Sequence, residues 1–555
     1  MARGALALSV LTAALTLAPR PGAALSDRGI YTSPPGVPSW SELAAHGAVI
    51  GAISVHVENI FNPYDPKESA WLYRTANALH MRTREHVVRT QLLFKTGDTV
   101  QPRRVAETER ILRGRQYLFD AWIVPESYDA ATNTVNVSVT VRDVWTLSPN
   151  FNFSHTGGTN KTGYNIQEQN LFGSGDAIEI EREFTVDRTS TIFSFSTNNL
   201  GDTWWKTALS YQNNSDGKVA QYDLEHPFYS LDTRKAYGIS GSDATSIVDI
   251  YNYGQIVGQF LKRENQMQVY YGGSSGDIGG WTRRWYVGAR YDSADFREDP
   301  FTATPYPSPP ERRLSYPYVA WEVDQDSYAK AQNQDQIGRT EDLYYGFSLY
   351  TELGYSSPAF GADRNAVLPR FTVNDGWHWD HQHEQRLFVG LGGSGRLEYG
   401  RLDNGILNFS SRYYWIHNEH SLFYALLTGE ATKRLDGDSQ VLLGGDTGLR
   451  GYPIRYQAGT SDVLCTVEER LFSNWYPLRL VRVGGAVFVD SGRVWGPGPF
   501  GAPPLGWLSD AGVGLRVGNS RSGLGNVLHV DFSWTLNTAP NAPHFQITVQ
   551  TEQSF

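Results

Sequence analysis

Residues 442–453 read LLGGDTGLRGYP, and this stretch decides how the rest of the chain is interpreted. Its glycines disfavour both a stable helix and a long strand, so it is predicted to be a closely packed loop that places Arg450 at a defined position. A guanidinium shielded from water needs carboxylate partners. Two follow soon after on strand-like segments, Glu468 and Asp490. The hypothesis is a loop folded into a barrel and held by a buried ion pair.

The composition favours a β-barrel over a helical membrane protein. The 555 residues include 31 Tyr, 16 Trp and 55 Gly, yet only 40% are hydrophobic and the mean hydropathy is −0.40. A barrel that shows lipid only every second residue has such an average. After the N-terminus, no segment has the roughly 18 consecutive apolar residues of a membrane-spanning helix.

Charge and motifs exclude several function classes. The net charge is −10 with no block of like charge, which argues against nucleic acid as a partner. Cys465 is the only cysteine, so no intrachain disulfide and no cysteine-based metal site is expected. The chain has no H-E-x-x-H or Walker motif, so we expect neither an enzyme nor a cofactor.

The N-terminus is predicted to be a secretory signal peptide over residues 1–24. A basic start is followed by an apolar core over residues 6–17 and by small residues up to Ala24. The alternative is a membrane anchor, but this apolar core is too short to span a bilayer. Residues 25–46, rich in Pro and Ser, are expected to form a lead-in segment.

Residues 47–145 are predicted to form a compact soluble domain with the order β-α-α-β-β. Strands are expected at 50–57, 119–124 and 135–141, and residues 64–83 are expected to be a polar insertion or long loop. Helices are expected at 84–94, which ends before Gly97, and at 98–113, with Pro102 near its start.

Residues 146–555 alternate between apolar and polar side chains in many segments. Trp285, Val287 and Tyr291 oppose Arg284 and Arg290, and residues 343–353 alternate in the same way. A soluble β-sandwich is the alternative, but its strands are shorter and fewer. The fold class is therefore mainly β, with an antiparallel transmembrane barrel. At about 50 residues a hairpin, the 410 residues predict roughly 16 strands.

Several motifs in order resemble the BamA/TamA superfamily of outer-membrane assembly and translocation barrels, the bacterial surface antigen type. Residues 47–145 resemble one polypeptide-transport-associated (POTRA) domain. The matching stretches are FKTGD at 94–98, ETERILR at 107–113, QNLFGSG at 169–175, LRGY at 449–452, EER at 468–470 and FVDSG at 488–492. The terminal Phe555 resembles an outer-membrane sorting signal read by the assembly machinery, which would insert this chain.

The resemblance implies a 16-stranded barrel in the bacterial outer membrane with a periplasmic POTRA domain. It places an inward loop motif inside the lumen, with Asp490 as the partner of Arg450 and with Glu468 and Arg470 also facing inward. The motif consists of Gly448, Leu449, Arg450, Gly451 and Tyr452. The ion pair could set the state of the barrel, or could only stabilise its interior. Removing one partner of such a pair is expected to harm function or assembly.

The implied function is insertion or translocation of unfolded or nascent client proteins. Clients would add a strand to the POTRA edge and use a seam between the Asn152 region and residues 545–555. The rivals are a passive channel constricted by residues 444–453 and a structural surface protein that uses the Pro-rich loop 299–310 for contacts.

Residues 377–384, WHWDHQHE, raise the possibility of a metal site. His381 and His383 are spaced to share one face of a strand, but no third ligand is evident, so a turn at the membrane interface is the preferred interpretation and no metal is predicted.

Overall fold

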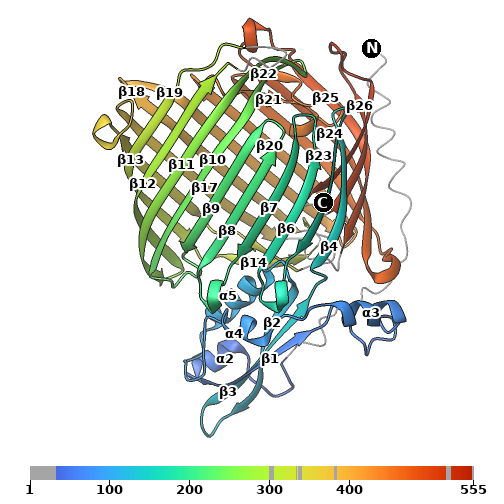
Figure 1. Ribbon diagram of the computed structural model, residues 1–555. Helices are drawn as coiled ribbons and strands as arrows, with labels where there is room; N and C mark the ends of the chain where they lie inside the picture. Colours follow the sequence, from blue (N-terminus) through green and yellow to red (C-terminus); the bar gives the residue numbers. More distant parts are fainter. Residues whose placement is uncertain are drawn as a thin grey trace. The chain divides into compact units, whose positions relative to one another are not determined.

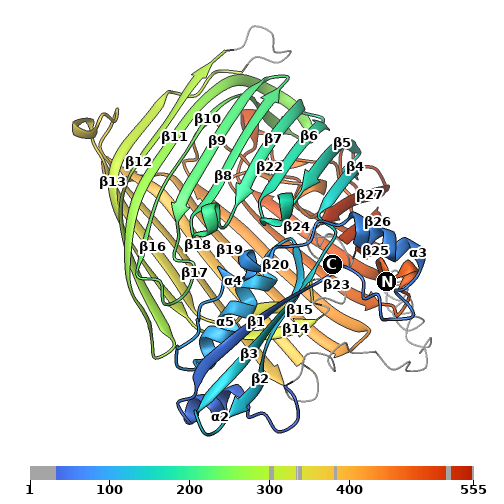
Figure 2. The same ribbon diagram turned by 60° about the horizontal axis from the view of Figure 1, so that its bottom comes forward.

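The computed structural model describes residues 33–298, 306–332, 334–335, 340–380, 384–519 and 527–552. They fall into two compact units. The first lies within Met1–Ser54, Thr96–Val100 and Val124–Ser138. The second comprises Val55–Lys95, Gln101–Ile123 and Val139–Phe555 and includes the large barrel in Figures 1 and 2. The predicted signal peptide and Phe555 lie outside the described residues.

The N-terminal region is α+β, as predicted, but it has more helices than expected. A three-stranded sheet has the order β1-β3-β2. The elements are α2 (Trp40–Ala45), β1 (Val49–Glu58), α3 (Trp71–Leu79), α4 (Glu85–Arg89), α5 (Pro102–Arg113), β2 (Leu118–Asp129) and β3 (Thr134–Asp143). Ser39 and Glu42 cap α2 with a reciprocal capping box. No described helix is both long and apolar enough to cross a membrane.

Helix α3 corrects the sequence prediction, because residues 64–83 were expected to form a polar loop. The helix has only nine residues. Tyr73 is its one buried side chain, so no repeating apolar stripe marks an inward face. The β-α-α-β-β order predicted for residues 47–145 therefore omitted α3, and the predicted lead-in segment over residues 25–46 contains α2.

The barrel is closed and antiparallel, but it has 20 strands rather than the predicted 16. In order they are β4 (Leu147–Thr156), β5 (Thr159–Glu168), β6 (Ala177–Phe184), β7 (Thr189–Thr197), β8 (Lys206–Asn214), β9 (Gly217–His226), β10 (Lys235–Asn252), β11 (Gln255–Ile278), β12 (Trp281–Arg297), β13 (Arg312–Gln325), β16 (Ser348–Ser356), β17 (Ala366–Asp380), β18 (Glu384–Glu398), β19 (Arg401–Asn418), β20 (Ser421–Lys433), β23 (Ser461–Phe472), β24 (Val481–Trp495), β25 (Trp507–Asn519), β26 (Val527–Thr535) and β27 (Phe545–Glu552).

The strand number was underestimated because strand length varies widely round the barrel. Strand β6 has 8 residues, whereas β11 has 24. The first hairpin, β4–β5, needs only Gly157 and Gly158 for its turn. Both glycines have positive φ, of 56° and 79°, as a two-residue hairpin turn requires. An average of about 50 residues a hairpin is therefore too large for β4–β9.

The predicted alternation of side chains is present in the barrel wall. Trp285 and Val287 of β12 are each 45% exposed on the outer face, whereas Arg516 of β25 and Asp531 of β26 are fully buried inside. The outward face carries apolar side chains on strand after strand, for example Val269, Trp321, Leu353, Leu407, Val487, Val513 and Phe532. An apolar exterior and a polar interior characterise a barrel whose solvent is lipid.

A short hairpin interrupts the strand that was predicted over residues 343–353. β14 (Tyr328–Gln332) pairs with β15 (Thr340–Tyr344), and the barrel wall resumes only at β16. The hairpin reaches side chains of the wall, because Tyr414 of β19 donates its hydroxyl to Asp335 at 3.1 Å and Arg386 of β18 donates to the Gln334 side chain at 2.5 Å. Alternation in the sequence did not distinguish this hairpin from a wall strand.

Candidate functional site: a loop folded into the barrel

The connection between β20 and β23 folds back into the barrel. β21 (Val441–Leu443) pairs with β22 (Gln457–Gly459) and closes residues 444–456, which we call the inward loop. Gly448 allows its sharp bend, since its φ is +117° and a Cβ there would lie 2.4 Å from Leu464. The glycine-rich sequence of the loop therefore reflects close packing against the wall.

Apolar and aromatic side chains anchor the inward loop against the wall. Leu449, Tyr452 and Tyr456 are completely buried, and they pack with residues of β23, β24 and β25. The Tyr452 hydroxyl donates to the Ser509 carbonyl at 3.1 Å. This small core holds the loop in place and excludes water from the neighbouring charge.

Arg450 forms a bidentate ion pair with Asp490 of β24. Its Nε lies 2.7 Å from one carboxylate oxygen and its Nη2 lies 2.9 Å from the other. Thr466 donates its hydroxyl to the same carboxylate at 2.7 Å. Parallel hydrogen bonds of this kind fix both the position and the orientation of the guanidinium.

Further groups surround the same guanidinium. Nη1 of Arg450 lies 2.7 Å from Glu468 and 3.4 Å from Asp531. The guanidinium carbon lies 3.3 Å from the centre of the Phe488 ring, which adds a cation–π contact. Three carboxylates and one aromatic face thus converge on a side chain that is only 9% exposed.

Two more arginines balance the charge of these carboxylates. Arg470 donates to Glu468 at 3.1 Å, and Arg516 donates to Asp531. Arg450, Glu468, Asp490 and Arg470 were predicted from the sequence as site residues, and the structure brings all four together. Asp531 and Arg516 were not predicted as site residues, although alternation in their strands could have placed both on the inner face.

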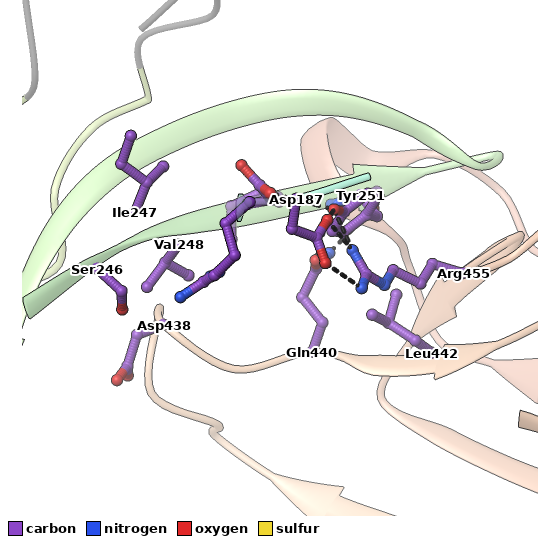
Figure 3. A pocket seen from close by; sticks show the side chains of 12 residues that line it. Asp187, Ser246, Ile247, Val248, Tyr251, Asp438, Gln440, Leu442 and Arg455 are labelled. Atoms are coloured by element: carbon purple, nitrogen blue, oxygen red, sulfur yellow. Dashed lines mark hydrogen bonds and ion pairs between the residues drawn. The ribbon is translucent and has the colours of Figure 1, made fainter. Parts of the chain in front are cut away.

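A second arginine of the inward loop binds the far side of the junction between β27 and β4, where the barrel closes. The Nη1 and Nη2 atoms of Arg455 lie 2.8 and 2.6 Å from the two carboxylate oxygens of Asp187, in the turn between β6 and β7. Asp187 also accepts from the hydroxyl of Tyr251 at 2.8 Å, and Figure 3 shows these groups beside a cavity of about 340 Å³. The loop is therefore held at two points, Arg450 and Arg455, by two different ion pairs.

The residues that precede the inward loop are tied to another part of the wall. Asp436 accepts both terminal nitrogens of Arg396 of β18 at 2.7 Å and a bond from Arg312 of β13 at 2.9 Å. Asp438 lies 3.0 Å from Lys262 of β11. This single connection thus makes ion pairs with widely separated strands of the barrel.

The β14–β15 hairpin links helix α5 to the same network. At its base, Asp342 forms a bidentate pair with Arg113 at 2.7 and 2.8 Å, and Lys330 lies 2.6 Å from Glu109. At its far end, the Gln334 carbonyl accepts from Arg470 at 3.2 Å. Polar contacts therefore continue from α5 through the hairpin to Arg470, Glu468 and Arg450.

The predicted metal alternative is not tested, because His381 and His383 lie outside the described residues. Within the described part of the chain, no group of His, Cys, Asp and Glu side chains is arranged to hold a metal ion.

The ion pairs of Arg450 and Arg455 bind the inward loop to the barrel of the same chain. The closed, outwardly apolar barrel with an internally anchored loop defines a transmembrane β-barrel of the outer-membrane type.

Solved structures of similar proteins were found, whereas no protein-family model and no curated protein matches the chain. BamA from Haemophilus ducreyi, lacking POTRA domains 1–3, has 12% identity and a TM-score of 0.37 over 90% of this chain and 85% of that chain. CdiB from Escherichia coli has 13% identity and a TM-score of 0.44, over 90% and 76% of the two chains. CdiB from Acinetobacter baumannii has 11% identity and a TM-score of 0.42, over 91% and 73%.

These solved structures include BamA, after which the superfamily in the sequence resemblance is named. All three TM-scores lie below 0.5, so the fold described here rests on the chain's own strand pairing.

Substituting Arg450 by alanine should strongly destabilise the barrel. The change leaves Asp490 and Glu468 buried without their common partner, and breaking a buried ion pair costs about 3–5 kcal/mol. Arg263→Ala is the matched control, because Arg263 pairs with Asp243 on the surface, where both side chains are more than half exposed. Denaturant unfolding in detergent measures both variants. Equal stability of the two variants would contradict a structural role for the Arg450 pair.

The Arg455–Asp187 pair should give the barrel a pH-dependent contribution to stability. Burial alone raises the pKa of Asp187, but hydrogen bonds from Arg455 and Tyr251 outweigh it, so the pKa lies below its ordinary value. The stabilisation is then present above the unfolded-state pKa, near 4, and is lost as the pH falls through the lower folded-state pKa.

Asp187→Asn should therefore unfold at a lower temperature than the parent at neutral pH, and this difference should shrink below about pH 4. Thermal melts at a series of pH values, with Asp243→Asn as the surface control, measure it. A difference that stays constant down to pH 2 would show that the charge of Asp187 is not the cause.

Proposed function

We propose that this protein assists the insertion or translocation of client proteins at the bacterial outer membrane. The clients are unfolded or nascent outer-membrane or secreted proteins, and the assembly machinery inserts the barrel itself into the lipid bilayer. The POTRA-like region, residues 47–145, lies in the periplasm and the barrel over residues 146–555 lies in the membrane. No covalent step and no cofactor are part of this proposal. The observation that carries it is the weak closure of the barrel between β27 and β4.

At the closure, the described residues of β27 and β4 oppose one another only at Val549 and His155. The neighbouring pair β26–β27, by contrast, is in register from Val527 opposite Glu552 to Trp534 opposite Phe545. A short pairing leaves backbone N–H and C=O groups that another strand can bind. We therefore assign the closure as the seam at which a client strand enters the barrel wall.

The inward loop supports the seam from inside the barrel. Arg450 holds the loop to β23, β24 and β26 on one side of the seam. On the other side, Arg455 holds it to Asp187, and the Ile454 N–H lies 3.4 Å from the carbonyl of Gly157 in the β4–β5 turn. The loop thus supplies side-chain links across a junction where backbone pairing is short. Before the seam can open, the loop must release its contacts with the strands on at least one side of the seam.

The sheet of the POTRA-like region offers less room for an added strand than the seam does. The outer edge of β1 already receives residues 97–99, since Gly97 donates to the Ile50 carbonyl at 2.8 Å and Val49 is bridged to Thr99. The other edge, β2, contains Pro125, which has no N–H to donate. Client binding by β-augmentation here would therefore use the parts of β1 and β2 beyond these positions.

Removing the gene should lower the amounts of a small set of proteins in the outer-membrane and secreted fractions. Quantitative proteomics of both fractions, with and without the gene and after complementation, measures the effect. Loss of specific proteins that complementation restores supports the proposal and identifies clients. An unchanged proteome together with a steady conductance in planar bilayers would instead identify a passive channel.

A disulfide across the seam should abolish the activity while leaving the barrel folded. Extending the register from Val549 opposite His155 places Gln550 opposite Ser154, so the test variant is Ser154→Cys/Gln550→Cys in a Cys465→Ser background. The lock control, Ser148→Cys/Gln167→Cys, joins β4 to β5 within a hairpin that is already fully paired.

Complementation should fail for the seam variant under oxidising conditions and recover on reduction, whereas the control should complement in both. Full complementation by an oxidised seam variant would rule out the seam as the route of clients.

A further inference from the structure

Helix α3 is fixed to the end of the barrel by one of its faces. Tyr73 is buried against Phe61, with ring centroids 4.7 Å apart, and its hydroxyl donates to the Leu478 carbonyl in the β23–β24 turn at 3.0 Å. The side chain of Asn77 bonds both backbone groups of Phe61, at 3.1 and 2.8 Å. This inward face is therefore packed and satisfied in its hydrogen bonds.

The opposite face of α3 presents large apolar side chains to the outside. Trp71 is 70% exposed, Leu72 is 42% exposed and Leu79 is 73% exposed. At 100° per residue they fall on one side of the helix together with Thr75 and Ala78. Thr75 donates its hydroxyl to the Trp71 carbonyl at 2.9 Å, so it adds little polarity to that side. A nine-residue helix with this composition is poorly suited to water.

The exposed face continues that of the neighbouring barrel turn. Trp475 and Leu478, in the β23–β24 turn that Tyr73 contacts, are 66% and 67% exposed. Next along the wall come outward side chains of β23 and β24, including Leu471 and Val487, which are 45% and 43% exposed. In both Figure 1 and Figure 2, α3 lies beside the ends of the C-terminal strands, drawn in orange and red. The apolar surface thus runs from the barrel wall onto the helix.

We propose that α3 is a membrane-interface helix that places Trp71, Leu72 and Leu79 in the lipid leaflet at this end of the barrel. Tryptophan side chains favour the boundary between headgroups and acyl chains, and short amphipathic helices lie in this layer with their apolar side down. Arg74 is exposed next to the apolar face and can reach lipid phosphates. Continuity with the outer wall favours lipid over a protein partner, because the wall already defines the level of the bilayer.

The segment after α3 is fixed close to the start of β4. His80 lies 2.8 Å from Asp143, and Thr83 donates its hydroxyl to the same carboxylate at 2.7 Å. Asp143 ends β3, and β4 begins at Leu147. The helix itself is fixed to the turn between β23 and β24. The lipid-bound segment therefore connects the walls that flank the closure, at the end of the barrel where β4 starts. The proposal requires a bilayer round the barrel but does not depend on any client.

Nitroxide accessibility in vesicles tests the proposal on the full chain. The label is attached to Leu79→Cys in a Cys465→Ser background, and the barrel is reconstituted in vesicles of phosphatidylethanolamine and phosphatidylglycerol. Val487→Cys, on the outer wall, is the lipid control, and Ala131→Cys, in the exposed β2–β3 turn, is the aqueous control. Heat-modifiable migration in gels shows that each labelled variant has folded.

The ratio of accessibility to oxygen over accessibility to a water-soluble nickel complex should be several-fold higher at Leu79 than at Ala131, and close to that at Val487. A ratio equal to that at Ala131 would overturn the proposal. Low accessibility to both reagents would show that protein covers the face, and dipolar broadening that grows with the protein-to-lipid ratio would identify a second copy of the chain. Either result would also overturn it.

Discussion

The ion pairs of Arg450 are the interaction on which the interior of this barrel depends. A guanidinium in a nearly dry site is tolerated only where carboxylates compensate the lost hydration, and Asp490, Glu468 and Asp531 do so together. Because these carboxylates come from three different strands, their common partner fixes the loop relative to the wall. Arg470 and Arg516 then keep the cluster close to charge balance.

The same loop explains how a barrel with a weak closure can remain closed. Backbone pairing between β27 and β4 is short in the described residues, whereas side chains of the inward loop bind strands on both sides of it. Backbone ladders are difficult to open locally because each bond lost inside a membrane exposes polar groups to lipid. The Arg455–Asp187 pair is partly exposed, so water can replace its bonds and this link of the loop can be released more easily than a full backbone ladder.

Two connections between wall strands, the β14–β15 hairpin and the β9–β10 turn, contact helix α5. The β14–β15 hairpin contacts Arg470 at one end and receives Arg113 of α5 at the other. Helix α5 also meets the β9–β10 turn, where Asp232 accepts from Arg103 and Arg104 at 2.6 and 2.9 Å. Contacts within one compact unit therefore join α5 to the residues that hold the inward loop.

The sequence by itself determined the barrel class, the alternation of its faces and the composition of the central ion pair. Period-two alternation and an arginine in a glycine-rich loop have few physical solutions, since lipid requires paired backbone and burial requires a paired charge. The number of strands, the β14–β15 hairpin and the helix α3 were decided only in the tertiary structure. Strand length depends on tilt and on partners, and residues 343–353 alternate equally well in a hairpin or in the wall. Asp531 and Arg516 joined the network because the inward loop folds back against neighbouring strands, and Asp187 joined it because barrel closure brings a distant part of the chain to the loop. No local pattern in the sequence records either proximity.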